Sequence, residues 1–402
     1  MLQVLTPAQA GALLREKFHT LHMESETVPL EQALGRVLAR PVCAGEDVPG
    51  FTRSSVDGYA VRAADTFGCS ESIPALPDLM GAVEMGRPAG APCQPGQCFY
   101  VPTGGALPRG ADAVVMVEYA EDYGDGTVGL MKPVAPGENV VYQGDDVKVG
   151  QLLLPAGRVL RPHHIGALAA LGYAQVTAAR RPVVGVFSTG DEVVQVTDTP
   201  SFGQVRDVNG PMLLAAAAGA GGAGRSYGIL PDDRAAITDT LARAAGACDL
   251  VLLSGGSSAG VKDVAADILA GLGEVFFHGL AMKPGKPTIA GRIGTTPVFA
   301  LPGHPVAAYF VFQALVRPLL LAMQGSEEPR RTVSAVLEQA IPSNHGRAEY
   351  VAVRLKDGLA SPVRGKSGLI TLLADSQGYL IVPGDCEGLP KGAQVEVWLY
   401  DG

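Results

Sequence analysis

Residues Asp249–Asp263 read DLVLLSGGSSAGVKD, an apolar run that ends in glycines and hydroxyl residues. The apolar run predicts a buried β-strand, and the following VAADILAGL predicts a helix. Glycines between a strand and a helix let backbone N–H groups approach a phosphate. The segment lacks the Gly-Lys-Ser/Thr ending of a P-loop. It therefore indicates an anion cradle for a ligand other than an ordinary nucleoside triphosphate.

The region from Pro182 to about Gly325 alternates strand-like runs with helical stretches. Alternation of this length predicts an α/β domain with a parallel sheet whose faces are covered. In such open sheets, ligands bind outside the carboxyl ends of the strands. Three loops that follow strand-like runs are rich in glycine and polar residues, and together they indicate a phosphate-bearing ligand: STGDEV from Ser188, SGGSSAGVKD from Ser254 and LPGHP from Leu301.

Three further regions differ from this one in their pattern of apolar and turn-forming residues. Thr6–Pro7 is typical of a helix start, and apolar residues continue at helical spacing through Leu38, so the N-terminal segment is expected to form helices. Short β-type runs separated by Pro and Gly turns fill residues 40–157, and a helix is expected at 161–173. After Gly325 the chain returns to β-type runs, which predict a small terminal β domain.

Composition narrows the classes of function. The 402 residues include 31 basic and 40 acidic side chains, a net charge of −9, which disfavours nucleic acid as a partner. The six cysteines form no zinc-binding pattern, and we interpret them as unpaired thiols. The N-terminus does not resemble a signal peptide, and no segment predicts a membrane span, so a cytoplasmic location is expected.

Acidic side chains accompany the glycine-rich loops. Carboxylates repel a phosphoanhydride unless a hard divalent cation such as Mg²⁺ lies between them. Glu192, Asp232 and Asp263 could form such a set. The alternative for each is a solvated or helix-capping acid, and Asp263 stands directly before a helical stretch.

Lys283 and Lys286 flank a Pro-Gly pair in the segment MKPGKP. Two converging ammonium groups would suit a small oxyanion, whereas lysines on a turn are commonly just solvated. His163–His164 and His304 lack the spacing of metal ligands, so packing or capping is the favoured interpretation.

The ordered set of motifs resembles the molybdopterin molybdenumtransferase family, the MoeA family, to which the C-terminal part of gephyrin is related. The resemblance covers nearly the whole chain. It rests on these segments: SSVDGYAVR, PTGGALPRGADAVVM, the GDD turn, VFSTGDEV, GILPDD, LLSGGSSAGVKD, MKPGKP, LPGHPV, GRAEYVAVRL and GKSGLITLLADSQGYLIV.

The resemblance implies an enzyme of molybdenum cofactor biosynthesis. Such enzymes insert molybdate into adenylylated molybdopterin with Mg²⁺ and release AMP. The family consists of homodimers whose active site lies between the α/β domain of one subunit and the second domain of the other. The implied domains are a helical N-terminal and linker domain (1–44 and 147–180), a β-rich protruding domain (45–146), an α/β molybdopterin-binding domain similar to the molybdopterin adenylyltransferase (181–325) and a C-terminal β-barrel (326–402). Transient contact with the adenylyltransferase and with acceptor molybdoenzymes is also expected.

The resemblance assigns roles to particular residues. Asp57, Thr103 and Asp146 would be the catalytic contribution of the second domain. Glu192, Asp232 and Asp263 would be catalytic carboxylates that hold Mg²⁺. The ligand-binding set would be Ser254, Gly255, Gly256 and Ser257 around the pyrophosphate, Lys283, Lys286, Arg347 and Ser367 around molybdate, and Pro302 and Pro305 in the PGHP loop.

The chain departs from the family pattern at a few positions. His304 replaces the usual Asn of the loop, Ala307 stands where a serine is usual, and Val208 replaces a hydroxyl residue. Ser257 occupies a usually aliphatic place. These departures leave open a paralogue that prefers tungstate. A non-catalytic molybdopterin-binding or scaffold protein of the same fold is a second alternative.

Overall fold

The structure is a computed structural model that describes residues 4–255, 259–326 and 331–400, without the side chains of residues 259–263. The chain divides into two compact units. The larger unit comprises residues 1–40, 156–162 and 175–402, and the smaller one comprises residues 41–155 and 163–174. The four domains expected from the sequence divide the chain more finely, and their boundaries remain a prediction.

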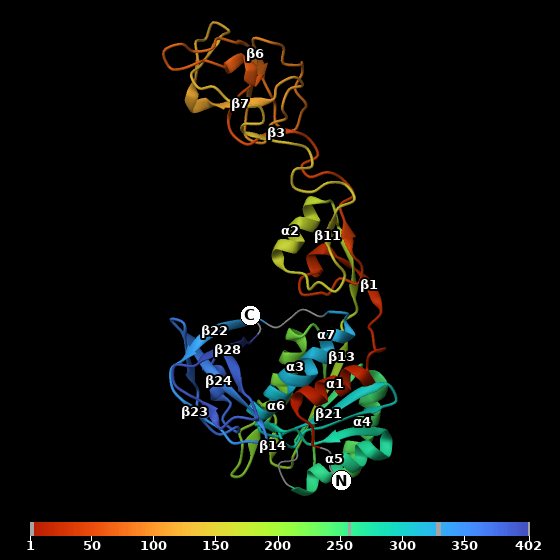
Figure 1. Cartoon of the computed structure of the whole chain (residues 1–402). Coiled ribbons are helices and arrows are strands. Elements are labelled where there is room, and N and C mark those ends of the chain that lie inside the picture. The colour runs from red at the N-terminus through yellow and green to blue at the C-terminus, as the bar shows by residue number, and fades with distance from the viewer. Residues whose placement is uncertain (1–3, 256–258, 327–330, 401–402) are drawn as a thin grey trace. The chain divides into compact units, whose positions relative to one another are not determined.

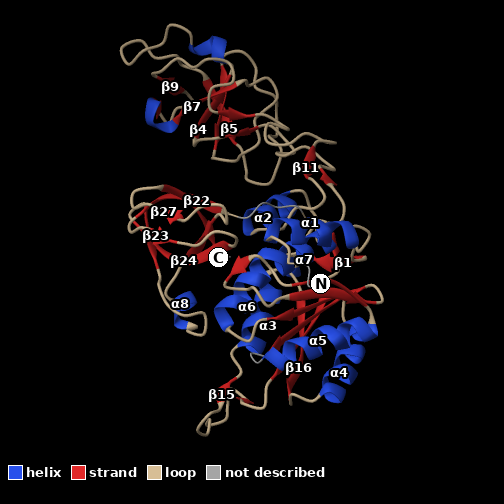
Figure 2. Cartoon of the chain, turned by 60° about the horizontal axis from the view of Figure 1, so that its bottom comes forward, coloured by secondary structure: helices blue, strands red, loops and turns tan. Residues whose placement is uncertain are grey.

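The larger unit contains a six-stranded mixed sheet (Figure 1, Figure 2). Its strands, in spatial order, are β16 (Ala223–Leu230), β13 (Val183–Thr189), β17 (Leu250–Gly255), β21 (Thr296–Leu301), β20 (Ile289–Ile293) and β18 (Glu274–His278). The first four are parallel, as predicted, but β20 and β18 are antiparallel to their neighbours. The prediction of a wholly parallel sheet is wrong at this edge, because a tight turn at Gly294 joins β20 directly to β21.

Helices cover both faces of this sheet. Alternate side chains of β17 are buried in two different apolar clusters, because successive strand residues point to opposite faces. One cluster includes residues of α3 (Asn209–Gly219), and the other includes residues of α4 (Arg234–Ala247) and α5 (Ala259–Leu272). The expected α/β layering is therefore confirmed.

Among the described helices, the segment Pro305–Met323 is long and apolar enough to cross a membrane, but 72% of it is buried inside the protein. It consists of α6 (Pro305–Val311), the π-helical turn η4 (Phe312–Val316) and α7 (Arg317–Met323). Phe310 and Phe312 of this segment are buried in the same cluster as residues of α3. Burial of this extent identifies it as a core helix of the larger unit.

The N-terminal segment is not a helical domain. The expected first helix forms as α1 (Pro7–Lys17), where Thr6 and Gln9 make reciprocal capping bonds. The helix expected through Leu38 is absent: β1 (Ser25–Pro29) pairs with β12 (Gln175–Ala179), and a single 3₁₀ turn, η1 (Leu30–Gln32), follows. Leu38 instead forms a bridge to Ala178 of β12. Pairing with a distant strand thus overrides the helical spacing of the apolar residues.

The C-terminal region is a closed five-stranded β-barrel, which confirms the expectation. Its strands are β22 (Thr332–Leu337), β24 (Ala348–Lys356), β25 (Leu359–Pro362), β26 (Gly378–Val382) and β28 (Gln394–Leu399). The ring closes because β24 pairs with both β25 and β26. β19 (Met282–Lys283) from the α/β region adds to β24 in parallel, so the barrel and the α/β region share a strand pairing.

The smaller unit is mostly β, as predicted. Its main sheet has the order β5-β6-β4-β7. The strands of this unit include β3 (Arg53–Ser54), β4 (Gly58–Val61), β5 (Asp78–Ala82), β6 (Gln97–Val101), β7 (Ala113–Met116) and β10 (Val140–Val141). The unit also contains all but the first residue of the helix α2 (Pro162–Ala170). Within this unit, β10 pairs with β3.

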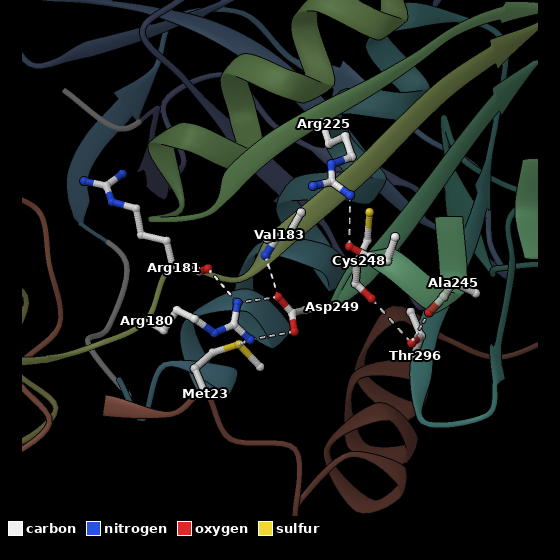
Figure 3. A network of polar contacts seen from close by, with 10 residues as sticks. Met23, Arg180, Arg181, Val183, Arg225, Ala245, Cys248, Asp249 and Thr296 are labelled. Atoms are coloured by element: carbon white, nitrogen blue, oxygen red, sulfur yellow. Dashed lines mark hydrogen bonds and ion pairs between the residues drawn. The ribbon is translucent and has the colours of Figure 1, made fainter. Parts of the chain in front are cut away.

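An ion pair fixes the end of the α/β sheet at which β13 and β17 begin (Figure 3). Both terminal nitrogens of Arg180 lie 2.8 Å from the carboxylate oxygens of Asp249, and the Val183 N–H donates to the same carboxylate at 2.7 Å. Partial burial alone would raise the pKa of Asp249, but the bonds from Arg180 and Val183 lower it below its usual value.

We expect Arg180→Ala to lower the free energy of unfolding by about 2 kcal/mol at neutral pH, because the Asp249 carboxylate then lacks its charged donor. A depressed pKa in the folded state contributes stability above the unfolded pKa that is lost as pH falls through the folded one. The deficit of the variant should therefore shrink in acid. Urea unfolding at neutral and acidic pH measures both effects.

The matched control is Arg243→Ala. Arg243 lies 3.0 Å from Asp239 on α4, and both side chains are more than half exposed. A solvated pair of this kind contributes at most about 1 kcal/mol. Equal losses in the two variants would contradict the role assigned to Arg180.

Candidate functional site

The carboxyl ends of β13, β17 and β21 border a cavity of about 440 Å³. The three strands end in register, since Thr189 pairs with Gly255 and Ser254 with Leu301. Ser188, Thr189 and Ser254 are among the residues that line the cavity. The expected position of the ligand site, at this edge of the sheet, thus coincides with a polar cavity.

Asn209, at the start of α3, connects the loops around the cavity. Its side-chain N–H₂ donates to Ser254 Oγ at 2.7 Å and to the Gly303 carbonyl at 2.8 Å. The side chain is 7% exposed. No role for Asn209 was predicted from the sequence, although its polar side chain at the start of an Ala-rich helix was a signal for capping contacts.

Asp207 supports the same edge from the preceding loop. Its carboxylate accepts hydrogen bonds from Ser188 Oγ at 2.8 Å and from the Gly210 N–H at 2.9 Å. Both hydrogen bonds that the carboxylate accepts come from groups of the protein itself. Asp207 therefore positions the cavity wall.

Glycines bring two of the loops together. A Cβ atom on Gly255, which has φ +150°, would lie 2.2 Å from Thr189 Oγ1 and 2.4 Å from the Thr189 carbonyl oxygen. A Cβ on Gly303 would lie 3.7 Å from the Gly255 carbonyl carbon. Ser254 and Gly255 of the predicted cradle thus border the cavity, whereas Gly256 and Ser257 lie outside the described residues.

Two of the three predicted metal-binding acids share one electrostatic environment. Glu192 lines the cavity, and the Asp232 N–H donates to Asp191 Oδ1 at 3.1 Å. Burial, followed by the negative charges of Asp191 and Glu192, raises the pKa of Asp232. The Asp263 side chain lies outside the described residues. Among the described side chains, no group of three or more His, Cys, Asp or Glu is arranged to hold a metal ion.

The predicted oxyanion lysines lie where the α/β region joins the barrel. Lys283 Nζ is 2.9 Å from Glu349 Oε1, and Ser343 Oγ donates to the other oxygen of that carboxylate at 2.7 Å. Lys286 is exposed on the loop between β19 and β20. Arg347 is exposed and directly precedes Ala348, the strand partner of Met282, so the strand pairing brings its backbone near the lysine loop.

The PGHP loop contacts the barrel through Ser367. His304 Nδ1 lies 2.9 Å from Ser367 Oγ, and the Val306 N–H donates to the Ser367 carbonyl at 3.2 Å. His304 and Pro305 line the cavity, and Pro302 is buried beside them in the chain. His304 thus has a hydrogen-bond partner that the expectation of packing or capping did not include.

The predicted residues of the smaller unit fall into two places. Asp57, just before β4, accepts a hydrogen bond from the Thr103 N–H at 2.7 Å, and both residues are exposed. Asp146 lies on the turn after β10, where its N–H donates to the Val48 carbonyl at 3.0 Å. The structure therefore brings Asp57 and Thr103 together and holds Asp146 on a separate turn.

Comparisons with known proteins cover the whole chain. Family models match the MoeA N-terminal region (domain I and II) at residues 5–172, a probable molybdopterin binding domain at 185–322 and the MoeA C-terminal region (domain IV) at 334–400. The chain is 33% identical to the molybdopterin molybdenumtransferase of Bacillus subtilis, over 99% of this chain and 95% of the relative. The chain belongs to the MoeA family.

Other relatives agree with this membership. The chain is 36% identical to molybdopterin molybdenumtransferase 2 of Mycobacterium tuberculosis, over 92% of this chain and 94% of that protein. The crystal structure of a molybdopterin biosynthesis MoeA protein from Pyrococcus horikoshii OT3 matches with a TM-score of 0.88 at 33% identity, covering 99% of this chain and all of the other. The resemblance inferred from the motifs is thus confirmed.

The contact between Gly255 and Thr189 makes a prediction about this MoeA cavity. Gly255→Ala should lower the free energy of unfolding by about 2 kcal/mol or more, because a methyl group there would overlap the Thr189 backbone. Gly246→Ala on α4 is the control, since its Cβ would meet nothing within 4 Å and alanine favours the helix. Urea unfolding compares them, and equal stability of the two variants would contradict the packing argument.

Proposed function

We propose that this protein is a molybdopterin molybdenumtransferase that inserts molybdate into adenylylated molybdopterin and releases AMP. One observation carries the proposal: the hydroxyl-lined cavity at the strand carboxyl ends occurs in a chain with full-length molybdenumtransferase relatives. Hydroxyl and backbone groups around Ser254 and Gly255 would bind the pyrophosphate oxygens. Gly256 and Ser257 would complete this cradle, and Pro302 and Pro305 would shape its far wall.

We propose that Mg²⁺ binds beside Glu192, on the acidic side of the cavity. Burial and then the negative charges of Asp191 and Glu192 raise the pKa of Asp232, and a divalent cation would relieve the charge repulsion. Glu192, Asp232 and Asp263 would hold the ion. When bound, it supplies charge neutralisation to the phosphoanhydride.

The remaining predicted residues would handle the second substrate and the chemistry. We propose that Lys283, Lys286, Arg347 and Ser367 bind molybdate, which is a small dianion suited to compact cationic groups. The contribution of the smaller unit would be Asp57, Thr103 and Asp146. We also propose a homodimer in the cytoplasm that exchanges substrate with the adenylyltransferase and delivers product to acceptor molybdoenzymes.

The test is AMP release from adenylylated molybdopterin with Mg²⁺ and either molybdate or tungstate. Dependence on molybdate supports the proposal, and dependence on tungstate identifies the tungstate-preferring paralogue, which the apolar Ala307 and Val208 keep as the second candidate. Ligand binding without release under either oxyanion would leave a molybdopterin-binding or scaffold protein.

Asp232→Asn should reduce AMP release by about 100-fold, because a neutral amide binds Mg²⁺ poorly and no longer balances its charge. The matched control is Asp233→Asn. Asp233 caps α4 by accepting a hydrogen bond from the Ala236 N–H at 2.7 Å, and asparagine caps equally well. Comparable activity of the two variants would refute the role of Asp232.

Activation by Mg²⁺ should be lost at acidic pH, and the position of this acid limb of the pH profile should depend on Asp191. Protons compete with the cation for Asp232, whose pKa is raised by burial and by its negative neighbours, so Mg²⁺ affinity falls as pH decreases. Asp191→Asn removes one neighbouring charge and lowers that pKa, which moves the acid limb to lower pH. Magnesium titrations of AMP release across pH measure the limb, and an unmoved or upward-shifted limb would contradict this account.

A further inference from the structure

One ring nitrogen of His304 is hydrogen-bonded within the protein. Nδ1 is hydrogen-bonded to Ser367 Oγ at 2.9 Å. Within the described part of the chain, the ring makes no second hydrogen bond or ion pair. The residue is exposed and lines the cavity. Since the two nitrogens are on opposite sides of the imidazole, an Nδ1 bond sets the orientation of Nε2.

The loop of the barrel at Ser367 contacts the His304 ring and also the backbone two residues after it. Ser367 contacts the His304 ring through Oγ and accepts a hydrogen bond from the Val306 N–H through its carbonyl. Gly368, the next residue, also lines the cavity, and a Cβ there would lie 3.9 Å from His304 Cδ2. The ring is therefore restrained by a second structural element, which is the requirement for a preorganised binding group.

Both acidic and basic side chains line the cavity beside His304. Glu192 and Asp207 are acidic, and Arg206 directs its Nε to the Val196 and Asp198 carbonyls. Ala307, one turn into α6 from His304, offers no hydroxyl group. His304 Nε2 is thus well placed to supply a side-chain donor on this wall.

We propose that His304 is a substrate-binding residue whose Nε2 donates to an anionic oxygen, while Ser367 fixes the ring through Nδ1. The inference rests on the proposed function, because the oxygen belongs either to the phosphate of adenylylated molybdopterin or to molybdate. It assigns His304 a role in affinity.

Two amide substitutions test the contributions of the two His304 ring nitrogens separately. An asparagine amide reaches the position of Nδ1, so His304→Asn keeps the Ser367 contact and loses the outer donor. A glutamine amide reaches the position of Nε2, so His304→Gln keeps the outer donor. We expect His304→Asn to raise the KM for either adenylylated molybdopterin or molybdate by about tenfold, with kcat unchanged. The kinetic constants of His304→Gln should stay close to those of the wild-type protein.

Separate titrations of adenylylated molybdopterin and of molybdate show which KM rises and so identify the source of the oxygen. The control is His19→Asn, because His19 is also exposed and uses Nδ1, here on the Glu16 carbonyl at 2.7 Å, but does not line the cavity. The inference would be overturned if both His304 variants kept wild-type KM values. It would also be overturned if His304→Asn had lower KM values than His304→Gln.

Calorimetric binding of AMP and of molybdate to the same proteins separates this inference from the proposed function. Weaker binding of either probe to His304→Asn, without AMP release by any protein, would support the inference and reject the insertion reaction. AMP release with unchanged KM values and unchanged probe binding in His304→Asn would support the insertion reaction and reject the inference. A wild-type protein that binds neither probe would overturn the inference.

Discussion

The close approach of β17 to β13 at their carboxyl ends is the constraint on which the cavity depends. Gly255 reaches Thr189 so closely that a methyl group would overlap its backbone. The strand pairing places Ser188 directly opposite Ser254, and both residues line the cavity. Asn209 then ties that wall to the Gly303 loop with one buried amide. Because the Thr189 and Ser254 hydroxyls are neutral, they would bind the proposed anionic oxygens without the desolvation cost of a buried cation.

The same strand is fixed at its other end by a charge pair, so β17 is held between two different kinds of polar anchor. Asp249 pairs with Arg180 where the strand begins, and Ser254 meets Asn209 where it ends. Between them the strand is apolar and buried on both faces. Sliding β17 by one residue would exchange its two faces and break both anchors, which keeps the edge that borders the cavity in register.

The sequence predicted elements whose signal is local and missed those that depend on distant partners. The strand DLVLLS, the capped helix at Thr6 and the β-type runs of the barrel form as expected. Helical spacing through Leu38 failed because β1 and Leu38 pair with β12, about 140 residues away, whose edge a single-sequence pattern does not reveal. The Asn209 and His304 contacts were missed for the same reason, since both link separate loops. The site residues came largely from resemblance, because spacing alone left solvated alternatives open.

The barrel contributes restraint as well as charge. Glu349 holds Lys283 at 2.9 Å and is itself held by Ser343, so the ammonium group is oriented before any oxyanion arrives. Lys283 is 45% exposed, and an ion pair at such a site contributes at most about 1 kcal/mol. A dianion can therefore share or displace this partner at little cost. Ser367 restrains His304 in the same manner, which makes the joining of barrel and α/β region the place where binding groups acquire fixed directions.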